Sequence, residues 1–288
     1  MKKIRTLLIG LGNIGYGYDK NSNYIQTHYK AIRNNKNFKL IGVIDKNEKK
    51  LNKIEDCYTN VKLEKKTLEN TDLIVLSVPT DIQYKFVKKI LNSGFKKNFL
   101  LEKPFVLNLR KLKEISKKNK KQKFFINYYR NYDDKLIRYL QKMSKNKNLK
   151  IEVMYSKGFF HNFSHYLNLF IKIFGKIENL QFKKKISLKN DFMANGLVRF
   201  KKLSLNFKNI SSNKESSFVI LKNNKKIFYY NNDGLKILNK VRNHELKINY
   251  NYMTNVYANI YKALNKTKSN IYDIDSHKLF LENLAEFK

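Results

Sequence analysis

The chain of 288 residues is 42% hydrophobic and 14% aromatic, which excludes a disordered protein and allows one large domain or two ordinary ones. It carries 60 Lys and Arg against 23 Asp and Glu, a formal net charge of +37, and has one cysteine, which excludes an internal disulfide framework. No apolar run approaches the roughly 20 residues of a membrane helix. We therefore expect a soluble, cytoplasmic protein with no membrane partner.

The positive charge comes almost entirely from lysine. There are 53 lysines and seven arginines, and the lysines form short dispersed pairs with 183–185 as the longest run. Asn, Ile, Tyr and Phe are abundant while Ala, Pro and Trp are scarce, a bias that A/T-rich codons produce. We interpret the lysines as a solvated surface and expect no nucleic-acid partner. A nucleic-acid binder driven by charge is the weakest alternative, and the positive field favours an anionic small ligand.

The first half of the chain alternates short apolar strands with amphipathic helices. Strands are expected over 4–9, 40–44, 73–78, 99–101 and 124–127, and helices over 26–33, 81–91 and 109–118. Apolar strands that alternate with helices indicate a parallel sheet covered on both faces, with right-handed crossovers. This pattern predicts a doubly wound α/β domain over residues 1–127.

The pattern changes after residue 127. Helices are expected over 133–145, 165–174, 250–264 and 275–287, and alternating strands over 150–155, 197–207, 217–221 and 226–230. Alternating strands suit an open antiparallel or mixed sheet. We expect a second α/β domain over residues 128–288.

A glycine-rich turn follows the first expected strand. Gly10, Gly12 and Gly15 have the spacing in which the first glycine permits a tight turn, the second admits a pyrophosphate and the third lets a helix pack closely. Asn13 and Ile14 complete the turn. A helix that begins there would direct backbone N–H groups at a phosphate. The turn therefore predicts a dinucleotide-binding site.

An acidic residue ends the second expected strand. Asp45 lies where a carboxylate accepts hydrogen bonds from the adenosine ribose, which favours NAD. Lys46 follows it and can pair with a 2′-phosphate, so NADP remains an alternative. The interval from Gly15 to Asp45 is longer than the usual ~20 residues. The excess lies in residues 16–24, which either shape a substrate entrance or form a surface excursion.

Four segments in combination resemble the Gfo/Idh/MocA family of NAD(P)-dependent oxidoreductases. They are GLGNIG at 10–15, VPT at 78–80, EKP at 102–104 and KGFFHNFSHYLNLF at 157–170. The resemblance implies a Rossmann domain followed by an α/β domain whose open sheet commonly mediates dimers or tetramers. We accordingly expect a homodimer or homotetramer.

The resemblance also implies roles for individual residues. The lysine of the EKP motif, here Lys103, contacts the nicotinamide and the substrate. Glu102 and the strand-end residues Ser77, Pro79 and Thr80 belong to the expected cofactor site.

The later histidine, His165, corresponds to the acid/base that moves the hydroxyl proton during hydride transfer. Oxidation of a secondary alcohol needs a base with a pKa near 7, which imidazole supplies, and a lysine ammonium stabilises the developing alkoxide. The alternative for His165 is a histidine that only caps its helix.

The chain departs from the family pattern around this histidine. The family's aspartate four residues before it is His161 here, and an acid often found three residues after it is Asn168. His161 or Asn162 must then replace the missing acid, and Asn162 and Asn168 are candidate substrate contacts. The departures resemble a divergent subgroup associated with bacterial surface-sugar pathways, or they signal weakened redox chemistry.

The remaining candidates complete the functional hypothesis. Arg130 contacts either a substrate group or an inter-domain carboxylate. His161 and His165 are spaced i, i+4, but no further ligand accompanies them, so no metal is expected. The sequence predicts an NAD(P)-dependent enzyme acting on a CH–OH group of a carbohydrate, with a nucleotide-activated sugar of surface-glycan synthesis as substrate. The alternative is a non-catalytic NAD-binding sensor or scaffold.

Overall fold

Two compact units make up the computed structural model. It describes residues 2–54, 58–59, 61–118, 122–146, 149–189, 191–210, 216–231, 234–237, 244–247, 251–267 and 273–286. Unit 1 comprises Met1–Tyr132 and Tyr250–Leu281, and unit 2 comprises Asp133–Asn249 and Glu282–Lys288. Cys57 and Phe287, the last residue of an expected helix, lie outside the described residues.

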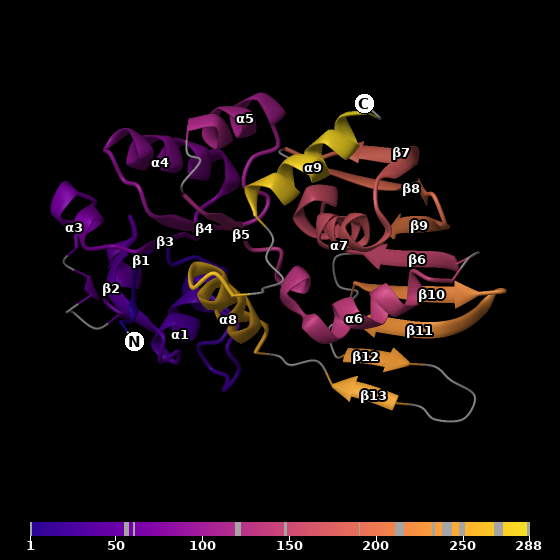
Figure 1. Ribbon diagram of the computed structural model, residues 1–288, viewed down its shortest axis with the longest axis horizontal. Helices are drawn as coiled ribbons and strands as arrows, with labels where there is room; N and C mark the ends of the chain where they lie inside the picture. Colours follow the sequence, from indigo (N-terminus) through magenta and orange to yellow (C-terminus); the bar gives the residue numbers. More distant parts are fainter. Residues whose placement is uncertain are drawn as a thin grey trace. The chain divides into compact units, whose positions relative to one another are not determined.

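Unit 1 is built on a parallel five-stranded sheet in the order β2-β1-β3-β4-β5. The strands are β1 (Ile4–Ile9), β2 (Phe38–Ile44), β3 (Leu73–Leu76), β4 (Asn98–Leu101) and β5 (Phe124–Ile126). The helices are α1 (His28–Arg33), α2 (Glu48–Leu51), α3 (Lys65–Glu69), α4 (Thr80–Asn92), α5 (Leu109–Lys118) and α8 (Tyr252–Leu264). Figure 1 shows α4 and α5 on one face of the sheet and α1 and α8 on the other. This arrangement confirms the predicted doubly wound α/β fold.

Burial on both faces explains why the strands of unit 1 are continuous apolar runs. Every residue of β3 is completely buried, and each large apolar side chain stabilises the fold by about 1.5–3 kcal/mol. Ile9 of β1 pairs with Leu76 of β3, so the segments that follow these two strands emerge side by side. Ligands of open α/β sheets bind where such carboxyl ends meet and the strand order reverses.

The C-terminal helix α8 belongs to unit 1, although the sequence had placed it with the second domain. Its residues Met253, Val256, Tyr257 and Ile260 are fully buried, and α8 packs against α1. Their i, i+3, i+4, i+7 spacing gives the helix one apolar face. Such periodicity identifies a buried helix face but does not identify the partner that covers it.

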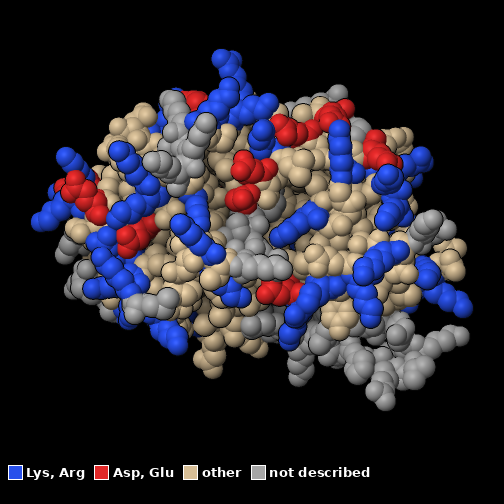
Figure 2. All heavy atoms as spheres, in the orientation of Figure 1, with Lys and Arg blue, Asp and Glu red and all other residues tan. Residues whose placement is uncertain are grey.

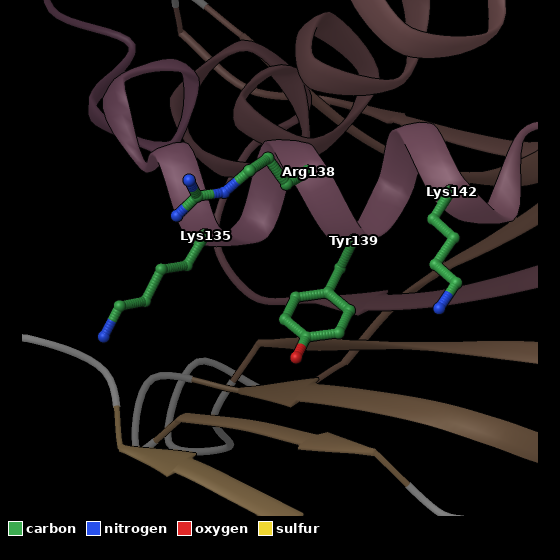
Figure 3. Close-up of a pocket in the computed structure, with 4 residues that line it drawn as sticks. All are labelled: Lys135, Arg138, Tyr139 and Lys142. Carbon is green, nitrogen blue, oxygen red and sulfur yellow. The ribbon is translucent and has the colours of Figure 1, made fainter.

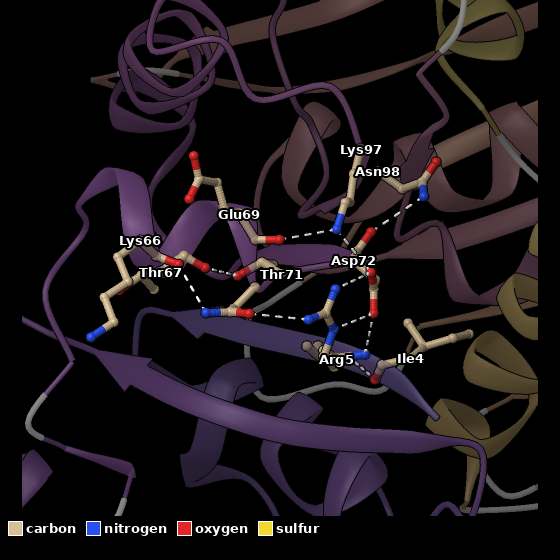
Figure 4. A network of polar contacts seen from close by, with 11 residues as sticks. Ile4, Arg5, Lys66, Thr67, Glu69, Thr71, Asp72, Lys97 and Asn98 are labelled. Carbon is tan, nitrogen blue, oxygen red and sulfur yellow. Dashed lines mark hydrogen bonds and ion pairs between the residues drawn. The ribbon is translucent and has the colours of Figure 1, made fainter. Parts of the chain in front are cut away.

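A polar network lies at the amino ends of the strands of unit 1 (Figure 4). The Asp72 carboxylate accepts hydrogen bonds from Arg5 Nε at 2.9 Å and from Lys97 Nζ at 3.0 Å. Burial alone would raise the pKa of Asp72, but the hydrogen bonds from the Arg5 side chain and backbone and from Lys97 outweigh it. The pKa of Asp72 is therefore held well below its usual range. The network joins β1 to the starts of β3 and β4 at the sheet edge opposite the glycine turn.

Unit 2 contains an eight-stranded mixed sheet in the order β13-β12-β11-β10-β6-β9-β8-β7. The strands are β6 (Leu149–Tyr155), β7 (Ile177–Ser187), β8 (Phe192–Phe200), β9 (Leu203–Asn209), β10 (Ser217–Lys222), β11 (Lys225–Asn231), β12 (Gly234–Ile237) and β13 (His244–Lys247). The helices are α6 (Asp134–Met143) and α7 (Ser164–Phe174), and α9 (Ile274–Ala285) begins in unit 1 and ends in unit 2. Among the described strands of this sheet, β6 and β9 are the one parallel pair. This confirms the predicted open mixed sheet.

One expected strand of unit 2 is two strands. The run 197–207 contains the end of β8 and the start of β9, separated by a turn at Lys201 and Lys202. The prediction of one strand was wrong because polar and apolar residues also alternate across much of this stretch.

No helix in the described parts of the chain is long and apolar enough to cross a membrane.

Candidate functional site

The glycine turn after β1 is shaped by close contact with the end of β3. Gly10 has φ of 101°, and a Cβ atom on it would lie 2.3 Å from the carbonyl oxygen of Ser77. A Cβ on Gly15 would lie 2.3 Å from the carbonyl oxygen of Gly10. The Cβ position of Gly12, by contrast, has its nearest described neighbour at 3.8 Å. The first and third glycines are thus required by the fold, whereas the second would meet only an ordinary van der Waals contact, and this is the glycine that admits the pyrophosphate in dinucleotide-binding turns.

The segment after the turn contains the insertion expected over 16–24, followed by the expected helix. Asn13–Gly17 form one short helical turn, and α1 begins only at His28. Asp19, which is buried, links the start of this insertion to its end. Its Oδ2 accepts hydrogen bonds from the backbone N–H groups of Gln26 at 2.7 Å and Thr27 at 2.8 Å. The extra residues therefore form a loop with its own buried polar anchor.

Asp45 ties the end of β2 to the glycine turn. Its Oδ2 accepts a hydrogen bond from Leu11 N at 2.6 Å, and its Oδ1 accepts one from Asn47 N at 2.8 Å. A carboxylate has about four lone-pair sites, so these two bonds leave acceptor capacity for ribose hydroxyls. Lys46 is exposed beside it.

Ser77 supplies a buried polar atom at the same edge. Its Oγ finds no hydrogen-bond partner among the described residues and lies 3.0 Å from the Cβ position of Gly15. Buried hydroxyls are nearly always hydrogen-bonded in native proteins, so this one suits a polar ligand atom or a water. Together with the uncrowded Gly12, it fits a bound dinucleotide. Pro79 follows as the N-cap residue of α4.

The EKP motif forms a turn after β4 that side chains of α4 hold in place. Gln83 Nε2 donates to the carbonyl oxygen of Glu102 at 2.9 Å, and Thr80 Oγ1 donates to that of Pro104 at 2.9 Å. Lys103, half-buried, lies between these two anchored residues. The Lys103–Pro104 peptide is cis.

A buried histidine contacts the glutamate of this motif. His28 is completely buried, its Nε2 lies 2.7 Å from Glu102 Oε1, and its Nδ1 lies 3.0 Å from the hydroxyl of Tyr257. Asn127 Nδ2 donates to the same Glu102 oxygen at 2.6 Å. Burial and the nearby Glu102 raise the pKa of Tyr257 well above its ordinary value. The sequence analysis missed this cluster because its members are far apart in the chain, and only the placement of His28 on a helix face hinted at burial.

Arg130 lies beyond the end of β5 among aromatic side chains of unit 1. It is buried, and its guanidinium lies 4.7 Å from the ring centroid of Tyr129, which in turn lies 4.5 Å from that of Tyr252. The buried guanidinium therefore lies against one ring of a tilted aromatic pair.

Unit 2 brings its four predicted residues onto one turn and helix. His161 and Asn162 belong to the helical turn Phe159–Phe163, while His165 and Asn168 lie on α7. His161 is exposed, whereas His165 and Asn168 are buried. Asn162 Nδ2 donates to Ser216 Oγ at 2.8 Å.

An aspartate that the sequence analysis did not single out anchors this turn. Asp191, from the connection between β7 and β8, accepts hydrogen bonds from Phe160 N at 2.9 Å and His161 N at 2.8 Å. A Cβ on Gly158 would lie 2.0 Å from Asp191 Oδ2, so glycine there makes room for the carboxylate. An acid is thus present beside His161, bonded to the backbone, although position 161 has none. Its distance along the chain hid it from motif spacing.

Basic groups line a separate cavity of about 330 Å³ on α6. Figure 3 shows Lys135, Arg138, Tyr139 and Lys142 projecting from this helix. Elsewhere, lysines and arginines are dispersed over the face seen in Figure 2. Within the described residues, no group of three or more His, Cys, Asp or Glu side chains is placed to hold a metal ion.

Comparisons with known proteins agree with this geometry. No curated protein matches the chain. A dehydrogenase from Chromobacterium violaceum shares its fold with a TM-score of 0.74 and 10% identity, covering 100% of this chain and 95% of that one. The dehydrogenase MviM from Clostridium difficile has a TM-score of 0.72 and 14% identity, covering 99% of both chains. UDP-N-acetylglucosamine 3-dehydrogenase from Acidithiobacillus ferrooxidans has a TM-score of 0.73 and 14% identity, covering 99% and 97%.

The family match comes from the Rossmann part of the chain. Residues 4–129 match the Gfo/Idh/MocA family, which is described as an oxidoreductase family with an NAD-binding Rossmann fold. This segment contains the glycine turn, Asp45, the end of β3 and the EKP turn. The Rossmann part of the chain, residues 4–129, is thus similar to the NAD-binding domain of the Gfo/Idh/MocA oxidoreductases.

Proposed function

We propose that the protein transfers a hydride between a nicotinamide cofactor and a hydroxyl or keto carbon of a carbohydrate. The observation that carries this proposal is the cradle at the carboxyl ends of β1, β3 and β4. There, the uncrowded Gly12 lies near the Ser77 hydroxyl, which has no hydrogen-bond partner among the described residues, and the anchored EKP turn carries Lys103 at the neighbouring strand end. We propose NAD as the cofactor, held at its ribose by Asp45, with NADP as the alternative through Lys46.

Each residue has a distinct part in the proposed reaction. The bound nicotinamide supplies the hydride-accepting and hydride-donating carbon. The ammonium of Lys103 stabilises negative charge on the substrate oxygen, and His165 takes and returns the hydroxyl proton. Arg130, Asn162 and Asn168 are proposed to contact substrate hydroxyl or anionic groups, and His161 to assist proton transfer.

A nucleotide-activated sugar is the proposed substrate. One protein of similar fold is described as a UDP-N-acetylglucosamine 3-dehydrogenase. The formal charge of +37 would attract an anionic substrate of this kind. A non-catalytic NAD-binding sensor is the second candidate, because His161 and Asn168 stand where the family pattern has acids.

Replacement of the proposed acid/base tests the reaction. His165→Ala is expected to lower the rate of hydride transfer by about 10²- to 10⁴-fold, the usual contribution of general acid–base catalysis, while NADH affinity stays nearly unchanged. The measurement is nicotinamide absorbance during turnover, after a screen of sugars and sugar nucleotides has found a substrate. Lys172→Ala, at an exposed position of the same helix and outside the proposed site, is the matched control. Undiminished turnover by folded His165→Ala would refute the assignment, and cofactor binding without turnover of any sugar would favour the sensor.

A further inference from the structure

The EKP turn is anchored on two sides. On the first side, Gln83 and Thr80 from the α4 segment bond to the carbonyl groups of Glu102 and Pro104. These bonds hold the main chain on either side of Lys103. The second side is the Glu102 side chain, which turns back into unit 1 and meets His28 and Asn127.

The Glu102 carboxylate is held by hydrogen bonds from neighbouring side chains of unit 1. Its side chain is only 12% exposed, and a buried carboxylate must find hydrogen-bond donors. One oxygen, Oε1, receives two donors, the imidazole Nε2–H of His28 and the amide of Asn127. A carboxylate only accepts hydrogen bonds, so we assign the donor role in this contact to His28 Nε2.

Two helices, α1 and α8, hold the ring of His28 in place. α1 carries it, and Tyr257 of α8 meets its other ring nitrogen at 3.0 Å. The start of α8 also holds the loop before α1, because Asn251 Oδ1 accepts from Ile25 N at 2.7 Å and Tyr252 OH donates to Gln26 O at 3.0 Å. The imidazole therefore has a fixed orientation when it reaches Glu102.

We propose that His28 is a positioning residue for Lys103. It fixes the Glu102 side chain, Glu102 fixes the main chain of the EKP turn, and the turn fixes where the ammonium of Lys103 is presented. Tyr257 and Asn127 are the supporting members of the same chain of contacts. What Lys103 does for catalysis rests on the proposed function, but the positioning can be measured without it.

Two amide variants of His28 distinguish its contact with Glu102 from its contact with Tyr257. In His28→Gln the side-chain amide can stand near the former Nε2 and donate to Glu102, whereas in His28→Asn it stands near the former Nδ1 and reaches only Tyr257. The readout is the rate at which the ε-amine of Lys103 is reductively methylated, followed by mass spectrometry on the protein without cofactor or sugar. Relative to exposed lysines, this rate is expected to change by about threefold or more in His28→Asn and in His28→Leu, and to stay near the parent value in His28→Gln.

A second readout follows catalysis. Once a substrate is known, His28→Asn is expected to lower kcat by about 10-fold or more, because small displacements of a reacting group are costly, with a much smaller change in NADH affinity. Asp72→Asn, at the opposite edge of the sheet, is the control for general destabilisation and should change neither the Lys103 labelling rate nor kcat.

The outcomes separate this inference from the proposed function. If folded His28→Asn and His28→Leu label Lys103 at the parent rate, His28 only fills the core and the inference is overturned. If His28→Leu does not fold, the Gln and Asn variants decide. If NADH does not bind at all, the proposed function fails while the labelling result still decides whether His28 positions Lys103.

Discussion

Single residues in the glycine turn differ in what constrains them. Gly10 and Gly15 have no room for a side chain because of the protein's own backbone, while Gly12 has room in the structure described here. The three glycines of one motif therefore make separable contributions. Two of them are constrained by the fold, and the middle one is proposed to face the pyrophosphate.

Alanine substitutions should separate these contributions. Gly12→Ala is expected to change the free energy of unfolding by less than about 0.5–1 kcal/mol, as for other substitutions without a clash, yet to weaken NADH binding by about 10-fold or more. Gly10→Ala should destabilise by about 2 kcal/mol or more, because it combines a positive φ with a clash against Ser77. Urea unfolding and nicotinamide fluorescence measure the two effects. Parent-like NADH affinity in Gly12→Ala would argue against a pyrophosphate at this turn.

A second residue-scale prediction concerns pH. Because the folded-state pKa of Asp72 is depressed, its network stabilises the protein above the ordinary aspartate pKa of about 4, and this stabilisation is lost as pH falls below that value. Asp72→Asn is expected to lower the free energy of unfolding at pH 7 by about 1 kcal/mol, with a smaller difference from the parent at pH 3. Urea unfolding at the two pH values tests this. An equal difference at both would exclude a role for the ionised carboxylate.

At the scale of elements, the predictable parts are those set by local pattern. The strand Ile4–Ile9 and the helix Leu109–Lys118 have the predicted bounds, because a short apolar run and an amphipathic repeat are both visible in the local sequence. The contact between His28 and Glu102 spans 74 residues and that between Asp191 and Phe160 spans 31, and neither leaves a local pattern. The break between Gly17 and His28 depends on Asp19, which reads as an ordinary loop acid.

The turn before α7 yields an element-scale prediction. Asp191→Ala removes the acceptor of three backbone N–H groups, two of them in the turn that carries His161, so this turn should loosen, as when a helix loses its cap. We expect a loss of about 1–2 kcal/mol in unfolding free energy and a lower kcat, with NADH affinity unchanged because the cofactor cradle is in unit 1. Asp191→Asn keeps one oxygen acceptor and should show a smaller effect. Hydrogen exchange at Phe160 and His161 reports the loosening directly, and unaltered protection there would contradict it.

At the scale of the whole molecule, the chain combines a Rossmann unit with a mixed-sheet unit under a large positive charge. The family match covers the Rossmann unit, and the similar solved structures extend the fold to nearly the whole chain. Composition alone would have pointed toward nucleic acid, whereas the motifs and their geometry point to a nucleotide cofactor. These two accounts differ in how binding should respond to salt, because neutralised phosphates release counterions and nucleic-acid affinity falls steeply with ionic strength.

The most direct test of the account is therefore a titration with NADH and, separately, NADPH at low and high salt. The chain has no tryptophan, so protein emission interferes little with nicotinamide fluorescence. We predict saturable NADH binding that persists at high salt, is stronger than NADPH binding and is weakened in Gly12→Ala. Absence of saturable binding of either cofactor by the folded protein would contradict the central claim that the cradle at the ends of β1, β3 and β4 holds a dinucleotide.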